Sequence, residues 1–283
     1  MLKALISLMR PKHYVKNGLI LVPLLFSGQL LVTGNLVTAF VAIIVFSLIA
    51  SLVYIINDVR DAERDKLHPK KKNRPIASGA VSRTQAISLA VIILVVAAAL
   101  VFMFRFDTIS IFFLALYLAI NVAYSFGLKN IPVVDVAILA AGFVIRVLYG
   151  ASVVDIDVSN WLYLTVLAGA FYVSLGKRRN EIMVNGTKSR KVNEGYTVAF
   201  LDKFMYVSLS LLLIFYSLWA TDGRDASLFW TIPIVMLVLM TYSLQVEKEG
   251  SLGDPVDVLF SNKVLPVLGL LYIIVTASLL YIR

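Results

Sequence analysis

Residues 36–65 read LVTAFVAIIVFSLIASLVYIINDVRDAERD, an apolar run that passes directly into a charged segment. A helix of about 20 apolar residues spans the hydrocarbon core of a bilayer. A helix also satisfies its own backbone hydrogen bonds in lipid. We therefore predict that residues 36–56 cross a membrane, and that Asn57 to Asp65 form the first cytoplasmic loop.

The composition of the whole chain is typical of a membrane protein and not of a soluble one. Its 283 residues are 60% hydrophobic and 15% charged, with a mean hydropathy of +0.87. Soluble domains are about 45–50% apolar and about 25% charged. We predict an all-α, polytopic membrane protein, a single domain over residues 1–283 with a possible repeat of two halves (about 1–130 and 131–283). Nine spans are expected, at 18–34, 36–56, 84–104, 108–126, 132–151, 160–176, 199–220, 228–244 and 264–282.

The placement of positive charge predicts the orientation. With the N-terminus inside, 22 of the 26 Lys and Arg residues fall on the cytoplasmic side, in the ends and loops between alternate spans. The positive-inside rule then gives a cytoplasmic N-terminus, an external C-terminus and a cell (inner) membrane location. No cleavable signal is expected at the basic N-terminus. The absence of cysteine excludes disulfides and thiolate metal sites.

The acids of the first loop have the spacing of a helix face. Asp58, Asp61 and Asp65 stand at i, i+3 and i+7, and Asn57 joins the edge of that face. Mg²⁺ binds one or two carboxylates together with substrate phosphates, so this face predicts a site for a magnesium-bound diphosphate. A basic run, residues 70–74, follows at once. The alternatives are a solvated helix end with surface ion pairs for the acids, and membrane topology for the basic run.

Two motifs carry a resemblance to the UbiA superfamily of intramembrane prenyltransferases: Asn57-Asp58-x-x-Asp61-x-x-x-Asp65, and Asn73-Arg74-Pro75-x-x-x-Gly79-x-x-Ser82. The resemblance covers nearly the whole chain, including the nine-helix count. It implies a helical bundle with a central cavity that opens laterally to lipid. It also implies that the aspartates bind a magnesium-complexed diphosphate substrate, from which a group is transferred to an acceptor.

The second loop departs from the pattern of that superfamily. A typical member has Asp-x-x-x-Asp after its sixth helix, whereas this chain has Lys177 at the first aspartate and Glu181 four residues later. A lysine attracts an anion and repels a cation. This suits two phosphorylated substrates, a diphosphate chelated through magnesium and a monophosphate held at a bare anion site by Lys and Arg. Topology is again the alternative explanation of the charge.

One branch of the superfamily, the decaprenyl-phosphate phosphoribosyltransferases, is similar in further segments: residues 10–17, 123–129, 135–146 and 176–181. The resemblance implies 5-phosphoribosyl 1-diphosphate as donor and a polyprenyl (decaprenyl) monophosphate as acceptor. The implied product is an early precursor of cell-envelope arabinose. We expect these two substrates and the bilayer as partners, no nucleic acid, and leave a homo-oligomer open.

The mechanism needs no strong general base, because a phosphate monoester with a second pKa near about 6 is already ionised. Magnesium, or manganese, which takes the same oxygen ligands, is expected on Asn57 and Asp61. Asp58 and Asp65 are expected to orient groups around it, to pair with cations or to bind through water. Lys71 and Arg74 are predicted to bind phosphates of the donor. The predicted catalytic residues are Asp58, Asp61 and Lys177.

Other predicted substrate contacts lie near the membrane face. Lys16 and Lys129 flank spans and could reach a phosphate, or only anionic headgroups. Tyr54 precedes Asp58 by one turn and could bind ribose or phosphate, or sit in the interfacial belt. Arg178 accompanies Lys177. Arg146 lies inside a span, where arginine is costly, so we predict a contact with the lipid phosphate or its first isoprene units; snorkelling is the alternative.

Two other functions compete with this interpretation. An ordinary member of the superfamily would move a prenyl group from its diphosphate to an aromatic or lipid acceptor, and the first loop fits that equally well. An anion transporter would place charged residues near the bilayer midplane on broken helices. Here the polar groups concentrate in two cytoplasmic loops, which favours an enzyme.

Overall fold

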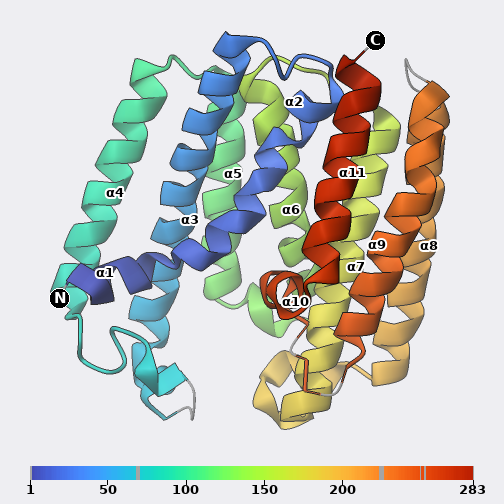
Figure 1. Ribbon diagram of the computed structural model, residues 1–283. Helices are drawn as coiled ribbons and strands as arrows, with labels where there is room; N and C mark the ends of the chain where they lie inside the picture. The colour runs from blue at the N-terminus through green and yellow to red at the C-terminus, as the bar shows by residue number, and fades with distance from the viewer. Residues whose placement is uncertain (1, 68–70, 223–225, 249, 252, 283) are drawn as a thin grey trace.

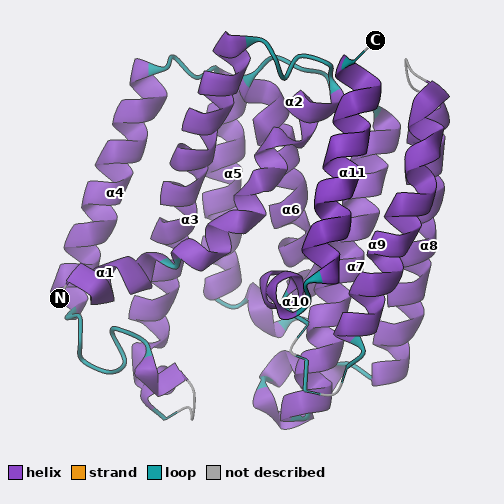
Figure 2. Cartoon of the chain, viewed as in Figure 1, coloured by secondary structure: helices purple, strands orange, loops and turns teal. Residues whose placement is uncertain are grey.

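The computed structural model describes residues 2–67, 71–222, 226–248, 250–251 and 253–282, and these contain helices and turns but no strand (Figure 2). His68 and Lys70 lie outside the described residues. The α-helices are α1 (Leu2–Met9), α2 (Val22–Phe26), α3 (Thr33–Lys66), α4 (Arg83–Met103), α5 (Thr108–Ser125), α6 (Val134–Val153), α7 (Asn160–Asn185), α8 (Val198–Asp222), α9 (Ile232–Val246), α10 (Pro255–Ser261) and α11 (Val264–Tyr281). The 3-10 helices are η1 (Pro11–Leu21), η2 (Lys71–Asn73), η3 (Leu128–Asn130), η4 (Thr187–Ser189), η5 (Lys191–Gly195) and η6 (Ala226–Thr231).

The long helices run side by side as a bundle (Figure 1). In the described residues, seven helical segments are long and apolar enough to cross a membrane: α3, α4, α5, α6, α8, residues 227–246 and α11. The all-α, polytopic class is therefore confirmed. Seven of the nine expected spans are found, and the count of nine is not confirmed.

Two expected spans differ from the structure. Residues 18–34 are divided among η1, α2 and a turn before Thr33, because Pro23 starts a new helix and Gly28 takes a φ of +75°. Residues 160–176 do lie in one helix, α7. That helix continues through Lys177, Arg178 and Arg179, so its final turns are too polar for lipid.

Both predicted loops begin as helix, which corrects the sequence analysis. No Gly or Pro occurs between Asn35 and Lys66, so α3 extends for 34 residues through Asp65. α7 likewise ends only where Gly186 takes a φ of +75°. The acidic and basic motifs thus lie on helix ends at the same end of the bundle (Figure 1), and a helix holds side chains more rigidly than a loop.

One close contact brings the N-terminal segment into the bundle. η1 packs against α6 at Gly150, where any Cβ would overlap the backbone of Ile20. A buried cluster that includes Phe46, Tyr117 and Tyr149 surrounds this contact. Because η1 is held there, its buried Asn17 meets Arg146 of α6 in the interior of the bundle.

Candidate active site

A cavity of about 560 Å³ opens among α3, α5, α6, α7 and η1. Of the twelve residues that the sequence predicted for the site, eleven line it: Lys16, Tyr54, Asn57, Asp61, Asp65, Lys71, Arg74, Lys129, Arg146, Lys177 and Arg178. The cavity therefore brings together residues from five helices and two motifs that are about 120 residues apart in the chain. Asp58 is the residue that it does not include.

Asp58 lies behind the cavity wall, with 2% of its surface exposed. Its Oδ1 accepts hydrogen bonds from Arg10 at 2.6 Å and from Arg74 at 3.0 Å, and Arg74 also donates to Asp65 at 2.6 Å. Arg10 and Arg74 both line the cavity. In this geometry Asp58 fixes two guanidinium groups and does not touch the cavity itself.

Asn57 and Asp61 form one half of a metal site. They lie one helical turn apart and both face the cavity. The Asn57 oxygen accepts from Ser125 at 3.3 Å, and Asp61 accepts from Lys129 at 2.9 Å. No group of three or more metal-binding His, Cys, Asp or Glu side chains gathers in the described residues. An amide and a carboxylate oxygen fit Mg²⁺ if substrate phosphates supply further ligands.

Lys177 meets an acid that the sequence analysis missed. Its ammonium group donates to Asp254 Oδ2 at 2.8 Å, and Lys16 donates to the same oxygen at 3.4 Å. The predicted bare anion site is therefore wrong, since Asp254 also lines the cavity. Asp254 followed by Pro255 is recognisable in the sequence as a helix N-cap. Its contact with Lys177, 77 residues away in the chain, is not recognisable from the sequence.

Burial and neighbouring charges shift the pKa values of this cluster. Burial would raise the pKa of Asp254, but the charges of Lys177 and Lys16 outweigh it and lower that pKa well below its usual range. Burial lowers the pKa of Lys16 to about 8, and Lys177 adds to the effect, while Asp254 opposes it. The lysine is thus charged at neutral pH and close to losing its proton just above it.

Arg146 lines the cavity and is 6% exposed. It donates to Asn17 at 2.9 Å, to Tyr117 at 3.1 Å and to the carbonyl oxygen of Gly142. In the part of the chain that the structure describes, no carboxylate pairs with it. A buried cation without a counter-ion attracts an anion into the cavity.

Arg178, unlike Arg146, has carboxylate partners within the protein. It is 2% exposed and donates to Asp135 at 2.5 Å, Glu181 at 2.6 Å and Asn193 at 3.1 Å. These bonds connect α6, α7 and η5 beside the cavity. Its neighbour Glu181 also binds Arg190 at 2.5 Å. Arg178 therefore holds this wall of the cavity in place.

The remaining predicted contacts lie near two residues that the sequence reasoning did not assign. The Arg10 guanidinium lies 4.9 Å from the centre of the Tyr54 ring, and the His13 ring lies 5.7 Å from it. Arg10 and His13 both line the cavity. Burial, followed by the charges of Arg190 and Arg74, lowers the pKa of Lys71.

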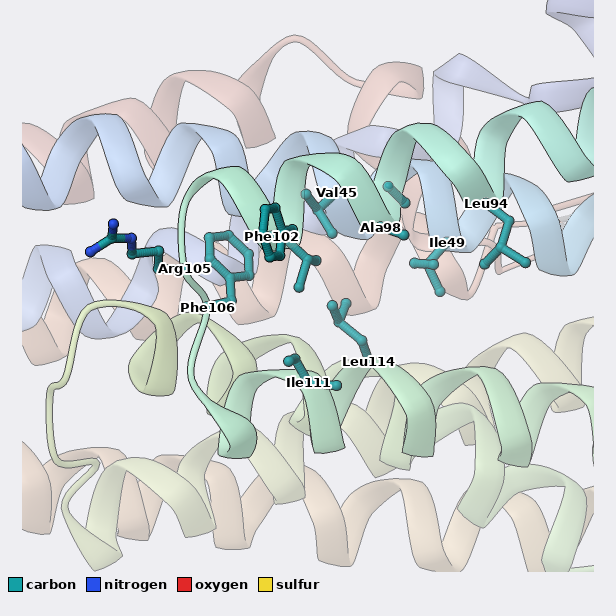
Figure 3. A pocket seen from close by; sticks show the side chains of 11 residues that line it. Val45, Ile49, Leu94, Ala98, Phe102, Arg105, Phe106, Ile111 and Leu114 are labelled. Atoms are coloured by element: carbon teal, nitrogen blue, oxygen red, sulfur yellow. The ribbon is translucent and has the colours of Figure 1, made fainter.

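A second cavity, of about 440 Å³, lies between α3, α4 and α5 (Figure 3). Its walls are apolar side chains such as Val45, Ile49 and Leu114, and Arg105 is its one charged lining residue. Among the described residues, no carboxylate lines it, in contrast to the first cavity.

The chain is similar to known proteins over nearly its full length. The sequence model of the UbiA prenyltransferase family matches residues 20–262. Decaprenyl-phosphate phosphoribosyltransferase of Corynebacterium glutamicum is 32% identical over 98% of this chain and 87% of its own, and that of Mycolicibacterium smegmatis is 34% identical over 99% and 93%. A structure of a UbiA homolog from Archaeoglobus fulgidus bound to GPP and Mg²⁺ matches with a TM-score of 0.75 at 17% identity, covering 98% of this chain and 99% of that one. The chain belongs to the UbiA prenyltransferase family.

Proposed function

We propose that this protein transfers 5-phosphoribosyl from 5-phosphoribosyl 1-diphosphate to a polyprenyl (decaprenyl) monophosphate and releases diphosphate. The charge of the cavity is the observation that carries the proposal. Its lining has four carboxylates, Asp61, Asp65, Glu181 and Asp254, against eleven Lys and Arg residues: Arg10, Lys16, Arg64, Lys71, Arg74, Lys129, Arg146, Lys177, Arg178, Arg190 and Lys191. So large an excess of cations suits two phosphorylated substrates together. The names of the relatives support the same reaction.

Two sets of cavity residues would bind the two substrates. Asn57 and Asp61 would hold Mg²⁺ (or Mn²⁺), which supplies charge neutralisation to the oxygens of the leaving diphosphate. Lys71 and Arg74 bind phosphates of the donor, while Asp58 and Asp65 hold Arg74 in place. Lys16, Lys177 and Arg146 line the same cavity and bind the acceptor.

The reaction is a displacement at the anomeric carbon of the ribose. An oxygen of the acceptor phosphate forms the new C–O bond, and the bond from that carbon to the diphosphate oxygen breaks with its electron pair. The acceptor is already ionised at neutral pH, so no side chain has to remove a proton. The protein contributes alignment of the two substrates and preorganised positive charge.

The proposal includes the setting of the enzyme in the membrane. The chain crosses the cell (inner) membrane with its N-terminus in the cytoplasm, and residues 18–34 and 160–176 complete nine crossings. The ends of α3 and α7 then face the cytoplasm, where a water-soluble phosphoribosyl donor is available. The lipid acceptor enters from the bilayer, towards Arg146.

A transfer assay tests the proposal directly. Purified protein is incubated with Mg²⁺, radiolabelled phosphoribosyl diphosphate and polyprenyl phosphate, and the label is measured in the organic phase. We expect label in the lipid, lost when EDTA removes the metal. Prenyl transfer from a polyprenyl diphosphate to 4-hydroxybenzoate, with no labelled lipid, would replace the proposal with the ordinary reaction of the family.

A further inference from the structure

Two ammonium groups share one carboxylate oxygen in the cavity. Asp254 Oδ2 accepts from Lys177 at 2.8 Å and from Lys16 at 3.4 Å, although these lysines lie on α7 and η1. An ammonium group has three donors, so each lysine keeps donors for a ligand. Both lysines line the cavity beside Asp254. Asp254 thus pairs with both lysines and leaves N–H donors on each of them for a ligand.

The backbone fixes the position of that acid. Its other oxygen, Oδ1, accepts from Val256 N at 3.0 Å and caps α10. The preceding residue, Gly253, has a φ of +65°, and a Cβ there would lie 2.8 Å from the Gly176 carbonyl oxygen and 3.0 Å from Lys177 Cα. Only glycine therefore allows this turn to lie against α7 at Lys177.

The charges around Lys16 show what the acid does. Lys16 faces Lys177 on α7, Arg146 on α6 and Asp254 before α10, and His13 is its neighbour on η1. Burial lowers the pKa of His13 to about 4, so the imidazole is neutral and adds no charge. Asp254 is the one group in this set that favours the protonated form of Lys16. Three cations and one acid leave a net charge of two, which matches a phosphate monoester dianion.

The position of Arg146 indicates which substrate binds here. Arg146 lies twelve residues into α6, about 18 Å from the start of that helix at ~1.5 Å per residue. Arg146 therefore lies inside the bundle, where the lipid substrate is expected rather than the water-soluble donor, and its charge acts on Lys16. The donor's ligands, Asn57 and Asp61, lie near the end of α3 instead.

We propose that Asp254 is a positioning residue of the acceptor's phosphate subsite, where it holds Lys16 and Lys177 side by side. This inference rests on the proposed function and adds a residue and a subsite to it. Asp254 touches neither the reacting carbon nor the leaving group. Its effect is therefore on the binding of the lipid phosphate, and it depends on pH.

The test compares wild type with Asp254→Asn, which keeps the shape of the side chain and removes its charge. KM is measured for a short polyprenyl monophosphate and for phosphoribosyl diphosphate, at about pH 6.5 and about pH 7.5. We expect the variant's KM for the lipid to exceed that of wild type about tenfold at the higher pH, where wild type keeps most of its Lys16 charged and the variant does not, and less than about twofold at the lower pH. KM for phosphoribosyl diphosphate should change less than about twofold at both.

Matched variants separate this role from structural damage. Asp257→Asn is the control, because Asp257 lies on the same helix, is exposed and pairs with Lys12 outside the cavity. It should leave both KM values unchanged, and Asp254→Glu should restore much of the lipid KM at about pH 7.5. A pH-independent loss, or equal changes in both KM values, overturns the inference. If wild type transfers no phosphoribosyl at all, the proposed function fails first, and binding of the monophosphate alone to the two proteins then tests the subsite.

Discussion

Each carboxylate around the cavity holds at least one cation that also faces it. Clustered cations repel one another strongly where solvent is sparse, so acids between them lower the cost of gathering them. The same acids orient the cations, whose remaining N–H donors are available to a ligand. The pairs are Asp58 with Arg10 and Arg74, Asp61 with Lys129, Asp65 with Arg74, Glu181 with Arg190, and Asp254 with Lys16 and Lys177.

Asp61 offers the sharpest test of the metal half-site. Asp61→Asn should lower kcat by about 10²–10³, the usual effect of removing one group that stabilises a transition-state charge. The activity that remains should need much more Mg²⁺, which a titration of rate against metal concentration measures. Glu63→Gln is the control, since Glu63 lies two residues away, is exposed and pairs with Lys66 and Arg83. Equal losses in the two variants would refute a specific role for Asp61.

Lys16 predicts a pH dependence of lipid binding. Its pKa, about 8 in the folded protein, is below the ordinary value because of burial and Lys177. The positive charge is therefore present below pH 8 and is lost as the pH rises through it. We expect the wild-type KM for polyprenyl phosphate to rise through that range while Lys16→Gln shows a high KM throughout. A wild-type KM that stays flat up to about pH 10 would contradict the assignment.

Arg146 should act on the same substrate from the membrane side. Arg146→Leu removes a buried cation that has hydrogen bonds to Asn17 and Tyr117 and no carboxylate partner in the described residues. We expect KM for the lipid to rise by about tenfold or more, while KM for phosphoribosyl diphosphate changes little. Arg146→Lys should recover part of the loss. Unchanged lipid kinetics in the leucine variant would remove Arg146 from the site.

At the scale of elements, α3 and α7 extend beyond the apolar core of the bundle and hold several residues of the candidate site. α3 and α7 both continue into charged turns, and short 3-10 helices and α10 close the cavity between them. Helical ends fix the directions of Asn57, Asp61 and Lys177 relative to the bundle. The connection before α10 completes the arrangement by bringing a distant acid against α7.

Gly253 is the position at which that connection is most constrained. Gly253→Ala adds the strain of a positive φ, about 1–2 kcal/mol, and a Cβ that overlaps the backbone at Gly176. We expect a lower thermal midpoint and a raised KM for the lipid. Gly250→Ala is the matched control, since Gly250 has a φ of +77° and open space around it. It should lower the midpoint a little and leave the lipid KM unchanged.

At the scale of the whole molecule, the distribution of charge gives the protein two distinct ends. The acidic and basic motifs gather at the end that holds the tips of α3 and α7, and the α6–α7 turn at the opposite end carries Asp155 and Asp157. This asymmetry is the basis of the proposed orientation in the membrane.

The absence of cysteine makes that orientation easy to measure. Lys72→Cys and Asp157→Cys each introduce a single thiol at an exposed position. In intact spheroplasts, a membrane-impermeant maleimide should label the Asp157 variant and not the Lys72 variant. Opening the membrane should make both reactive. The reverse pattern in intact spheroplasts would invert the orientation.

The sequence by itself determined the properties that depend on local spacing. The apolar runs predicted a membrane protein, because a helix of about 20 apolar residues is long enough to span the hydrocarbon core of a bilayer. The i, i+3 and i+7 spacing predicted Asp58, Asp61 and Asp65 on one face of a helix with Asn57 at its edge, and eleven of the twelve predicted site residues do line one cavity, Asp58 being the exception. The tertiary structure decided the partners of those residues. Asp254 reaches Lys177 across 77 residues and Lys16 across 238, and Asp58 turns towards Arg10 across 48. Helical periodicity is a local property of the chain, whereas such pairings depend on how η1, α7 and α10 pack.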